Sequence, residues 1–249
     1  MARILDITRV GGIAGIIVLI GIACFSAFAE PNDRVAGVVE EAGKEVPAPE
    51  LSDLRDKSGE AVFAQVCGVC HGPEGQGNAD LKSPSIAGMP PYYLLSQFEK
   101  FRSGKRGTDP HHVPGVQMRG IALALEPEVI EKVAVYIKSM DRIPTEDELG
   151  GDWKKGKVEY AERCMECHRF NGKGEIVFGS PPLTNLPDWY IFEQLQHFRD
   201  DRRGADETDE GGQKMRQATD GLSDENIKDI VAYIAELAAG RQPKGSIWR

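Results

Sequence analysis

The pentapeptide Cys67-Gly68-Val69-Cys70-His71 decides the fold, and it returns as Cys164-Met165-Glu166-Cys167-His168. In a C-x-x-C-H motif the two thiols lie about one helical turn apart and can form thioethers with both vinyl groups of a single haem. The adjacent histidine then reaches the haem iron. Two motifs therefore predict two covalently bound haem c groups. The predicted thioether anchors are Cys67, Cys70, Cys164 and Cys167, and the predicted proximal iron ligands are His71 and His168.

A C-x-x-C pair also occurs in zinc sites and in thiol redox proteins. A structural zinc site would need a second pair of Cys or His ligands at a suitable spacing. The remaining histidines, His111, His112 and His197, supply no such pair. Each C-x-x-C is followed at once by His, which favours haem over zinc or thiol chemistry.

The motif belongs to an internal repeat with an offset of 97 residues. Shifting the chain by this offset without a gap aligns both motifs together with glycines, aromatic residues and arginines. The aligned pairs include Gly59 with Gly156, Tyr93 with Tyr190, Phe101 with Phe198, Arg106 with Arg203, and Tyr136 with Tyr233. The chain is therefore predicted to be a tandem duplication of one haem module.

Each module has a helical pattern, and no segment of useful length alternates as a strand would. Helices are predicted to carry the motifs at 52–70 and 152–167, to lie in mid-module at 90–103 and 187–200, and to close the modules at 127–140 and 223–238. Pro127 suits a first helical turn and Ser223 suits a cap. The predicted domains are 51–143 and 144–240, preceded by an N-terminal segment 1–29 and a linker 30–50 and followed by a tail 241–249.

The second axial ligand determines the chemistry of each module. Met118 and Met215 are the methionines that coincide under the shift, and each lies 47 residues after its histidine. The alternative role of a lone methionine is core packing. Both methionines are predicted to lie in polar loops, VPGVQMRG and EGGQKMRQ, which favours ligation. His111 and His112 have no counterparts and are predicted to be exposed loop residues, and His197 to lie on a helix surface.

The N-terminal segment predicts export. Residues 10–29 carry no charge and follow Arg3 and Arg9, which fits a Sec signal. The small residues before Glu30 fit cleavage, whereas the length of the run fits a retained inner-membrane anchor. The acidic, proline-containing stretch at 30–50 is predicted to be a linker.

Composition excludes other classes of function. The chain is 41% apolar and 28% charged with a net charge of −9, as expected for a globular protein that does not bind nucleic acid. Four of its five cysteines belong to the motifs, so no disulfide framework is predicted. Cys24 is interpreted as a small apolar residue within the N-terminal run.

The motifs, the glycine-rich loops after them, the aromatic stretch PYYLLSQFEKFRSGKR and the closing helices resemble the cytochrome c4 family over residues 51–240. The resemblance implies an all-α fold with two class I cytochrome c domains related by a pseudo-twofold axis. The N-terminal apolar helix predicted from the sequence precedes these domains, and the long linker and possible anchor differ from the usual soluble member of the family. It implies haems that face each other near the domain interface. It also implies roles at the haem pockets or propionates for Tyr92, Tyr93, Trp189, Tyr190, Arg102 and Arg199. The sequence departs from the family at Arg169, where a glycine is usual, and in the acidic stretch 200–210.

Ligation by His and Met leaves no open iron position, which favours electron transfer over catalysis. The sequence therefore predicts an electron carrier on the periplasmic side of the bacterial inner membrane, not an enzyme. Its expected partners are a quinol-cytochrome c reductase and a terminal oxidase or reductase. The alternatives are the haem subunit of a dehydrogenase complex and a di-haem enzyme of the thiosulfate dehydrogenase kind.

Overall fold

The computed structural model describes residues 51–241. The predicted apolar helix within 1–29, the linker at 30–50 and all but the first residue of the predicted tail lie outside the described residues. Within 51–241, no helix combines the length and the apolar character that crossing a membrane requires. Both modules belong to one compact unit, in which they are packed against each other.

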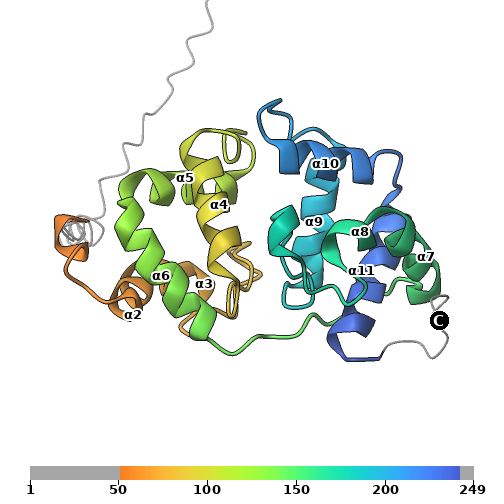
Figure 1. Cartoon of the computed structure of the whole chain (residues 1–249), viewed down its shortest axis with the longest axis horizontal. Coiled ribbons are helices and arrows are strands. Elements are labelled where there is room, and N and C mark those ends of the chain that lie inside the picture. Colours follow the sequence, from red (N-terminus) through yellow and green to blue (C-terminus); the bar gives the residue numbers. More distant parts are fainter. Residues whose placement is uncertain (1–50, 242–249) are drawn as a thin grey trace, which may run out of the picture. The chain divides into compact units, whose positions relative to one another are not determined.

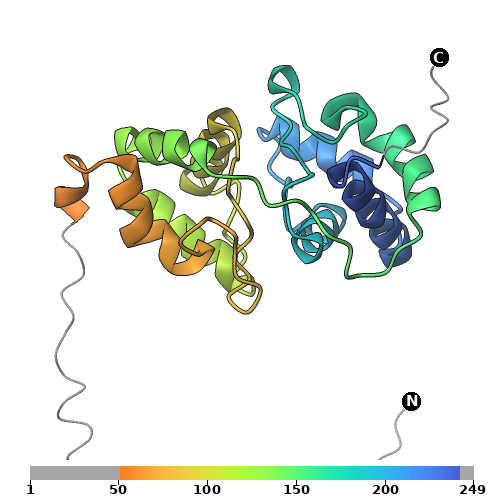
Figure 2. The same cartoon turned by 90° about the horizontal axis from the view of Figure 1, so that it is seen from below.

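The first module is a set of helices around the first motif (Figures 1 and 2). Helix α6 packs against α2 and α4, and α5 packs against α4. The elements are η1 (Leu51–Leu54), α2 (Gly59–Val62), the π-helical turn η2 (Phe63–Cys67), α3 (Gly68–His71), α4 (Pro91–Arg102), α5 (Val113–Ala124) and α6 (Pro127–Ser139).

The second module repeats this order. Helices α9, α10 and α11 each begin 97 residues after α4, α5 and α6. The elements are α7 (Trp153–Arg163), α8 (Met165–His168), η3 (Ile176–Phe178), α9 (Asp188–Arg199), α10 (Glu210–Thr219) and α11 (Asp224–Ala238). Within 51–241 the β-structure is limited to two isolated bridges, which join equivalent residues, Asn78 to Ser83 and Glu175 to Ser180. The predicted all-α tandem fold is confirmed.

The middle and closing helices match their predicted ranges to within one residue at either end. Pro127 lies in the first turn of α6, and the Ser223 hydroxyl accepts a hydrogen bond from the Asn226 amide as part of a capping box. The predicted motif helices were wrong in detail, because each is interrupted. The first becomes η1, α2, η2 and α3, and the second divides into α7 and α8 at Cys164.

In each module the helix before the motif crosses the closing helix at close range. Gly59 and Gly156 make this approach possible, because a Cβ atom at either position would overlap a backbone carbonyl of α6 or α11. Next to each crossing an aromatic pair fills the core: Phe63 with Tyr136 at 5.5 Å between ring centroids, and Tyr160 with Tyr233 at 5.3 Å. This crossing fixes the motif helix against the rest of its module.

The residue directly after each motif has a backbone conformation that normally requires glycine. Gly72 has φ 78° and ψ 156°, and Arg169, at the equivalent position, has φ 68° and ψ 162°. A residue other than glycine in this region of φ and ψ carries a backbone strain of about 1–3 kcal/mol. The side chain of Arg169 offers little compensation, since its ion pair with Glu175 is long, 3.9 Å, and largely exposed.

Arg169→Gly is therefore expected to raise the free energy of unfolding by about 1 kcal/mol, because it relieves backbone strain. The reciprocal variant, Gly72→Arg, is expected to lower it, since a Cβ atom there also meets the Gln76 side chain. Denaturant unfolding of the two full-length haem-loaded variants, followed by circular dichroism, measures both changes in the free energy of unfolding. A loss of stability in Arg169→Gly would mean that the contact with Glu175 outweighs the strain.

Candidate functional site

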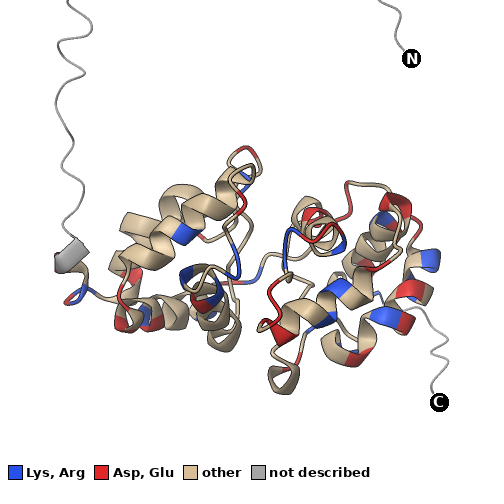
Figure 3. Cartoon of the chain, turned by 90° about the horizontal axis from the view of Figure 1, so that it is seen from above, with Lys and Arg blue, Asp and Glu red and all other residues tan. Residues whose placement is uncertain are grey.

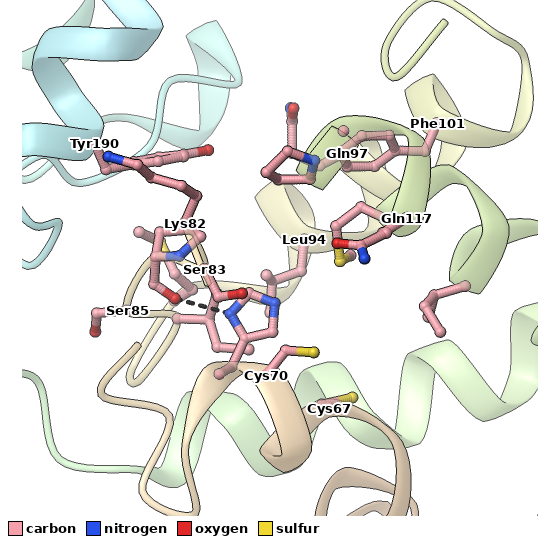
Figure 4. Close-up of a pocket in the computed structure, with 18 of the residues that line it drawn as sticks. Cys67, Cys70, Lys82, Ser83, Ser85, Leu94, Gln97, Phe101, Gln117 and Tyr190 are labelled. Atoms are coloured by element: carbon pink, nitrogen blue, oxygen red, sulfur yellow. Dashed lines mark hydrogen bonds between the residues drawn. The ribbon is translucent and has the colours of Figure 1, made fainter. Parts of the chain in front are cut away.

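A largely apolar cavity in the first module is bounded by the motif below and by α4 and α5 above (Figure 4). Cys67 and Cys70 line one side of it, and Leu94, Gln97 and Phe101 line the other. Each thiol is free, which is what thioether attachment to a cofactor requires. A planar apolar group bonded to both sulfurs would fill this space.

The motif histidine is held in one orientation at the cavity wall. The Nδ1 atom of His71 lies 2.8 Å from the Pro84 carbonyl oxygen, and that of His168 lies 3.1 Å from the oxygen of Pro181. Because a carbonyl can only accept, Nδ1 carries the proton and Nε2 keeps its lone pair for a metal. Burial lowers the pKa of both imidazoles, so both are neutral at pH 7.

The motif thiols do not resemble those of a redox-active C-x-x-C site. Burial raises the pKa of Cys67 and that of Cys164 to about 12. Thiol–disulfide enzymes instead lower the pKa of the attacking thiol. The thiol redox alternative is therefore not supported by the surroundings of these residues.

The two methionines lie in equivalent places on the cavity walls. Met118 lines the first cavity and Met215 the second, and both side chains are half-buried. The prediction that they lie in loops was wrong, since they belong to α5 and α10. The glycines of both segments suggested loops, but each segment has a residue that favours the start of a helix. Pro114 lies in the first turn of α5, and the Asp209 side chain caps α10 by accepting a hydrogen bond from the Gly212 amide.

A third methionine, Met89, also lines the first cavity, but it is buried in the core with 2% exposure. Its equivalent in the second module is Leu186. Met118 and Met215 thus place a thioether at the same position in both cavities, whereas Met89 does not.

The second cavity is built from the equivalents of the residues that line the first. Both contain the motif, the proline that holds its histidine, and an arginine from the segment after the middle helix, Arg106 or Arg203. The two cavities also share part of their walls. The residues common to both are Tyr93, Gln97, Leu186, Tyr190 and Gln194. A single layer of side chains therefore separates the two sites.

Two arginines join the modules within this layer. Arg106 donates hydrogen bonds to Gln97 of its own module and to the Tyr190 hydroxyl and Gln194 of the other, at 2.8 to 3.2 Å. Arg203 reciprocates with bonds to Gln194 and Gln97 and a longer one to the Tyr93 hydroxyl at 3.4 Å. Each guanidinium also stacks on a phenylalanine, Phe101 or Phe198.

The expectation for the aromatic and arginine residues was partly wrong. Tyr93 and Tyr190 line both cavities, but Arg102 and Arg199 are not among the lining residues. They bond instead to the carbonyls of Leu125 and Leu222 beside the closing helices. The arginines at the cavities are Arg106 and Arg203. The 97-residue offset pairs these two residues, but it pairs Arg102 with Arg199 equally well and could not select between the two pairs.

Tyr92 and Trp189 make contacts between the modules instead of lining the cavities. The Tyr92 hydroxyl donates to the Ser180 carbonyl at 2.9 Å, and the Lys82 ammonium lies 5.3 Å from the Trp189 ring centroid.

His197 is not a surface residue, contrary to the sequence prediction. Its side chain is buried in α9 with 8% residual exposure, and its ring meets His112 from the first module. Burial lowers the pKa of His197 to about 4, with His112 adding to the effect. His111, by contrast, is exposed as predicted. The same prediction was wrong for His112, whose side chain is only 24% exposed because it packs against the second module.

Comparison with known proteins agrees with the geometry. The family model described as cytochrome c matches residues 57–141 and again residues 153–238. Two such matches, each spanning a C-x-x-C-H motif at a cavity, define the chain as a di-haem c-type cytochrome that binds two haem c groups covalently.

Several cytochromes c4 match over most of the chain. Cytochrome c4 of Pseudomonas aeruginosa is 30% identical over 199 residues, which cover 75% of this chain and 93% of that protein. The crystal structure of reduced recombinant cytochrome c4 from Pseudomonas stutzeri matches with a TM-score of 0.58 and 28% identity, covering 71% of this chain and 95% of that one. The chain belongs to the cytochrome c4 family, and it functions in electron transfer.

A further relative carries a more specific name. The thiosulfate dehydrogenase electron acceptor of Thiomonas intermedia is 30% identical over 159 residues, which cover 57% of this chain and 67% of that protein.

Proposed function

We propose that each module holds its haem through the side chains at its cavity. In the first module, Cys67 and Cys70 form the thioethers, and His71 and Met118 provide the axial iron ligands. In the second module the corresponding residues are Cys164, Cys167, His168 and Met215. The proposal is supported by the equivalence of all these positions in the two cavities and by the Nδ1 hydrogen bonds that leave Nε2 of each histidine free.

A haem bound in each cavity supplies one reversible one-electron couple. The side chains around the cavity determine the reactivity and the reduction potential of this couple. Imidazole and thioether side chains would hold the iron from the two cavity walls, so oxygen or peroxide would find no open site. The apolar walls exclude water and so favour the iron state of lower net charge, which raises the reduction potential. These residues therefore favour transfer of electrons without bond making.

The observation that carries the proposal is the shared wall of the two cavities. Tyr93, Gln97, Tyr190 and Gln194 border both sites, so two redox centres would lie close enough to exchange electrons. The buried Arg203, which is 9% exposed, bonds there only to neutral oxygens among the described residues. A buried cation favours an anionic partner. Haem propionates at this interface, as the family resemblance implies, would supply one.

The proposed cellular role is to carry electrons from a quinol-oxidising complex to a terminal oxidase or reductase, on the periplasmic side of the bacterial inner membrane. Residues 10–29 would anchor the chain there if they are retained, and their removal would release it into the periplasm. Acidic and basic residues occur on the helices of both modules (Figure 3). The acidic stretch 200–210 has a less acidic counterpart at 103–113, which supports different partners for the two modules.

A second candidate role is to accept electrons from a dehydrogenase, and the similarity to the thiosulfate dehydrogenase electron acceptor favours it. In this role a separate chain oxidises the substrate and this chain removes the electrons. Catalysis by the chain itself would require an iron whose axial methionine is absent or displaced.

Rapid mixing of the oxidised full-length haem protein distinguishes these roles. Membranes that contain quinol-cytochrome c reductase and a quinol should reduce both haems, and an inhibitor of the reductase should block this reduction. Membranes that contain a terminal oxidase should then reoxidise them. Reduction only when thiosulfate and a thiosulfate dehydrogenase are both added would favour the second role. Steady turnover with thiosulfate alone would contradict the carrier proposal.

Arg203→Gln is expected to lower the reduction potential of at least one haem by about 60 mV, a tenfold change for a one-electron couple. Loss of a buried cation beside the cavities favours the oxidised, more positive state. Redox titration of the variant measures the shift. Arg202→Gln is the matched control. Arg202 is the sequence neighbour of Arg203, but it is exposed, so solvent screens its charge. Equal shifts in both variants would mean that Arg203 has no special position.

A further inference from the structure

The two sides of the interface between the modules are not equivalent in chemistry. On one side, Lys100 of α4 forms an ion pair with Asp209 at 2.7 Å, in which the carboxylate is almost fully buried. Under the 97-residue offset, Lys100 is equivalent to His197, and His112 is equivalent to Asp209. On the other side, therefore, two imidazoles meet where the first side has a cation and an anion. Their ring centroids are 4.6 Å apart with an interplanar angle of 82°.

A carboxylate completes this second side. Glu193 takes the place that Ser96 has in the first module. Its Oε1 atom lies 3.5 Å from Nε2 of His112 and 3.8 Å from Nε2 of His197. The three ligand atoms all lie within 4.8 Å of one another.

These residues are positioned by well-formed elements. Glu193 and His197 lie one turn apart on α9, and His112 lies directly before α5 of the first module. His197 is buried, and the other two side chains are about three-quarters buried. The group is thus prearranged and draws ligands from both modules, and His112 and Glu193 also line the first cavity.

We propose that His112, Glu193 and His197 bind one borderline transition-metal ion, of which Zn²⁺ and Cu²⁺ are the best fits, and that this ion clamps the two modules together. Imidazole with one carboxylate suits these ions better than Mg²⁺ or Ca²⁺, which prefer oxygen ligands. In a tetrahedral zinc site the ligand atoms are about 3.3–3.4 Å apart, given bonds of about 2.0–2.1 Å. Small side-chain movements bring the observed separations to that value, and water completes the coordination.

The surrounding charge limits the affinity. Lys82 lies near Glu193, and Arg202 and Arg203 lie near His197. These cations oppose a divalent ion, so the affinity is expected to be below that of a closed four-ligand structural site. The metal thus acts as a reversible clamp in place of the ion pair on the opposite side.

Equilibrium dialysis of the full-length haem protein against Zn²⁺, after treatment with a chelator, tests the proposal. Wild type should bind one zinc more than His112→Gln, His197→Gln or Glu193→Gln. His111→Gln is the matched control, because this exposed histidine lies next to the cluster but outside it, and it should bind zinc as wild type does. Each variant is first checked for its haem spectrum and helical content, so that loss of zinc is measured on folded protein.

Thermal unfolding gives a second readout. Because the ligands come from both modules, Zn²⁺ should raise the unfolding temperature of wild type and His111→Gln but not that of His112→Gln. Cu²⁺ should give an electron paramagnetic resonance signal with nitrogen splitting that His197→Gln loses. Equal zinc uptake by wild type and His112→Gln would overturn the proposal. The absence of zinc uptake by wild type would also overturn it, and shifted haem potentials in the variants would then assign the imidazoles to the haem site.

Discussion

Replacing Met215 by His is expected to lower the reduction potential of the second haem by on the order of 0.1 V or more, because axial ligands tune haem potentials over about 0.8 V. A thioether favours ferrous iron more than an imidazole does, so its replacement stabilises the ferric state. The half-buried Met215 side chain lines the cavity, and α10 brings it there. Redox titration should show one potential lowered and the other nearly unchanged.

Met118→His should give the mirror result for the first haem, because Met118 has the equivalent place on α5. Met140→Leu is the control: this methionine packs against the core at the end of α6 and lies outside both cavities. It should leave both potentials within error of wild type. If Met140→Leu shifted a potential as much as Met118→His, the assignment of the distal ligand would be wrong.

Gly156→Ala is expected to destabilise the second module by about 3 kcal/mol, at the upper end of the usual range for overpacking. The new Cβ atom would overlap the Asp229 carbonyl group of α11, and backbone there cannot move without separating the two helices. For a module of this size the unfolding temperature should fall by on the order of 12 °C or more. Circular dichroism of the full-length haem protein during heating measures the change.

Gly120→Ala provides the matched control. Gly120 is an exposed residue within α5, and a Cβ atom there meets nothing within 4 Å. The same substitution should be neutral or stabilise by up to about 1 kcal/mol, because alanine favours the helix. Similar losses in both variants would show that the tight helix crossing is not what makes Gly156 sensitive.

The repeat made much of the fold predictable from the sequence. Two C-x-x-C-H motifs and an ungapped offset of 97 residues predicted tandem helical modules, and the middle and closing helices have apolar faces that define their ranges well. The interruptions at Phe63–Cys67 and at Cys164 were not predictable, because a π-helical turn and a helix break leave the apolar spacing almost unchanged.

The sites were predictable in part. The offset identified Met118 and Met215, but their glycine-rich surroundings suggested loops, because the packing of α5 on α4 and α10 on α9 is not visible in local propensity. Burial of His197 depends on the second module meeting the first, which no single-helix pattern reveals. The same cause explains why Arg106 and Arg203 were not predicted as the arginines of the cavities.

The central claim, two methionine-ligated haems that only transfer electrons, is tested most directly by a spectroelectrochemical titration of the full-length wild-type haem protein. The signal to follow is the weak methionine-to-iron charge-transfer band that class I cytochromes c show. This band is expected to correspond in intensity to both haems, and both potentials are expected to be positive. A haem that lacks the band, or that titrates at a far lower potential, would contradict the ligand assignment and favour an enzyme with one displaced ligand.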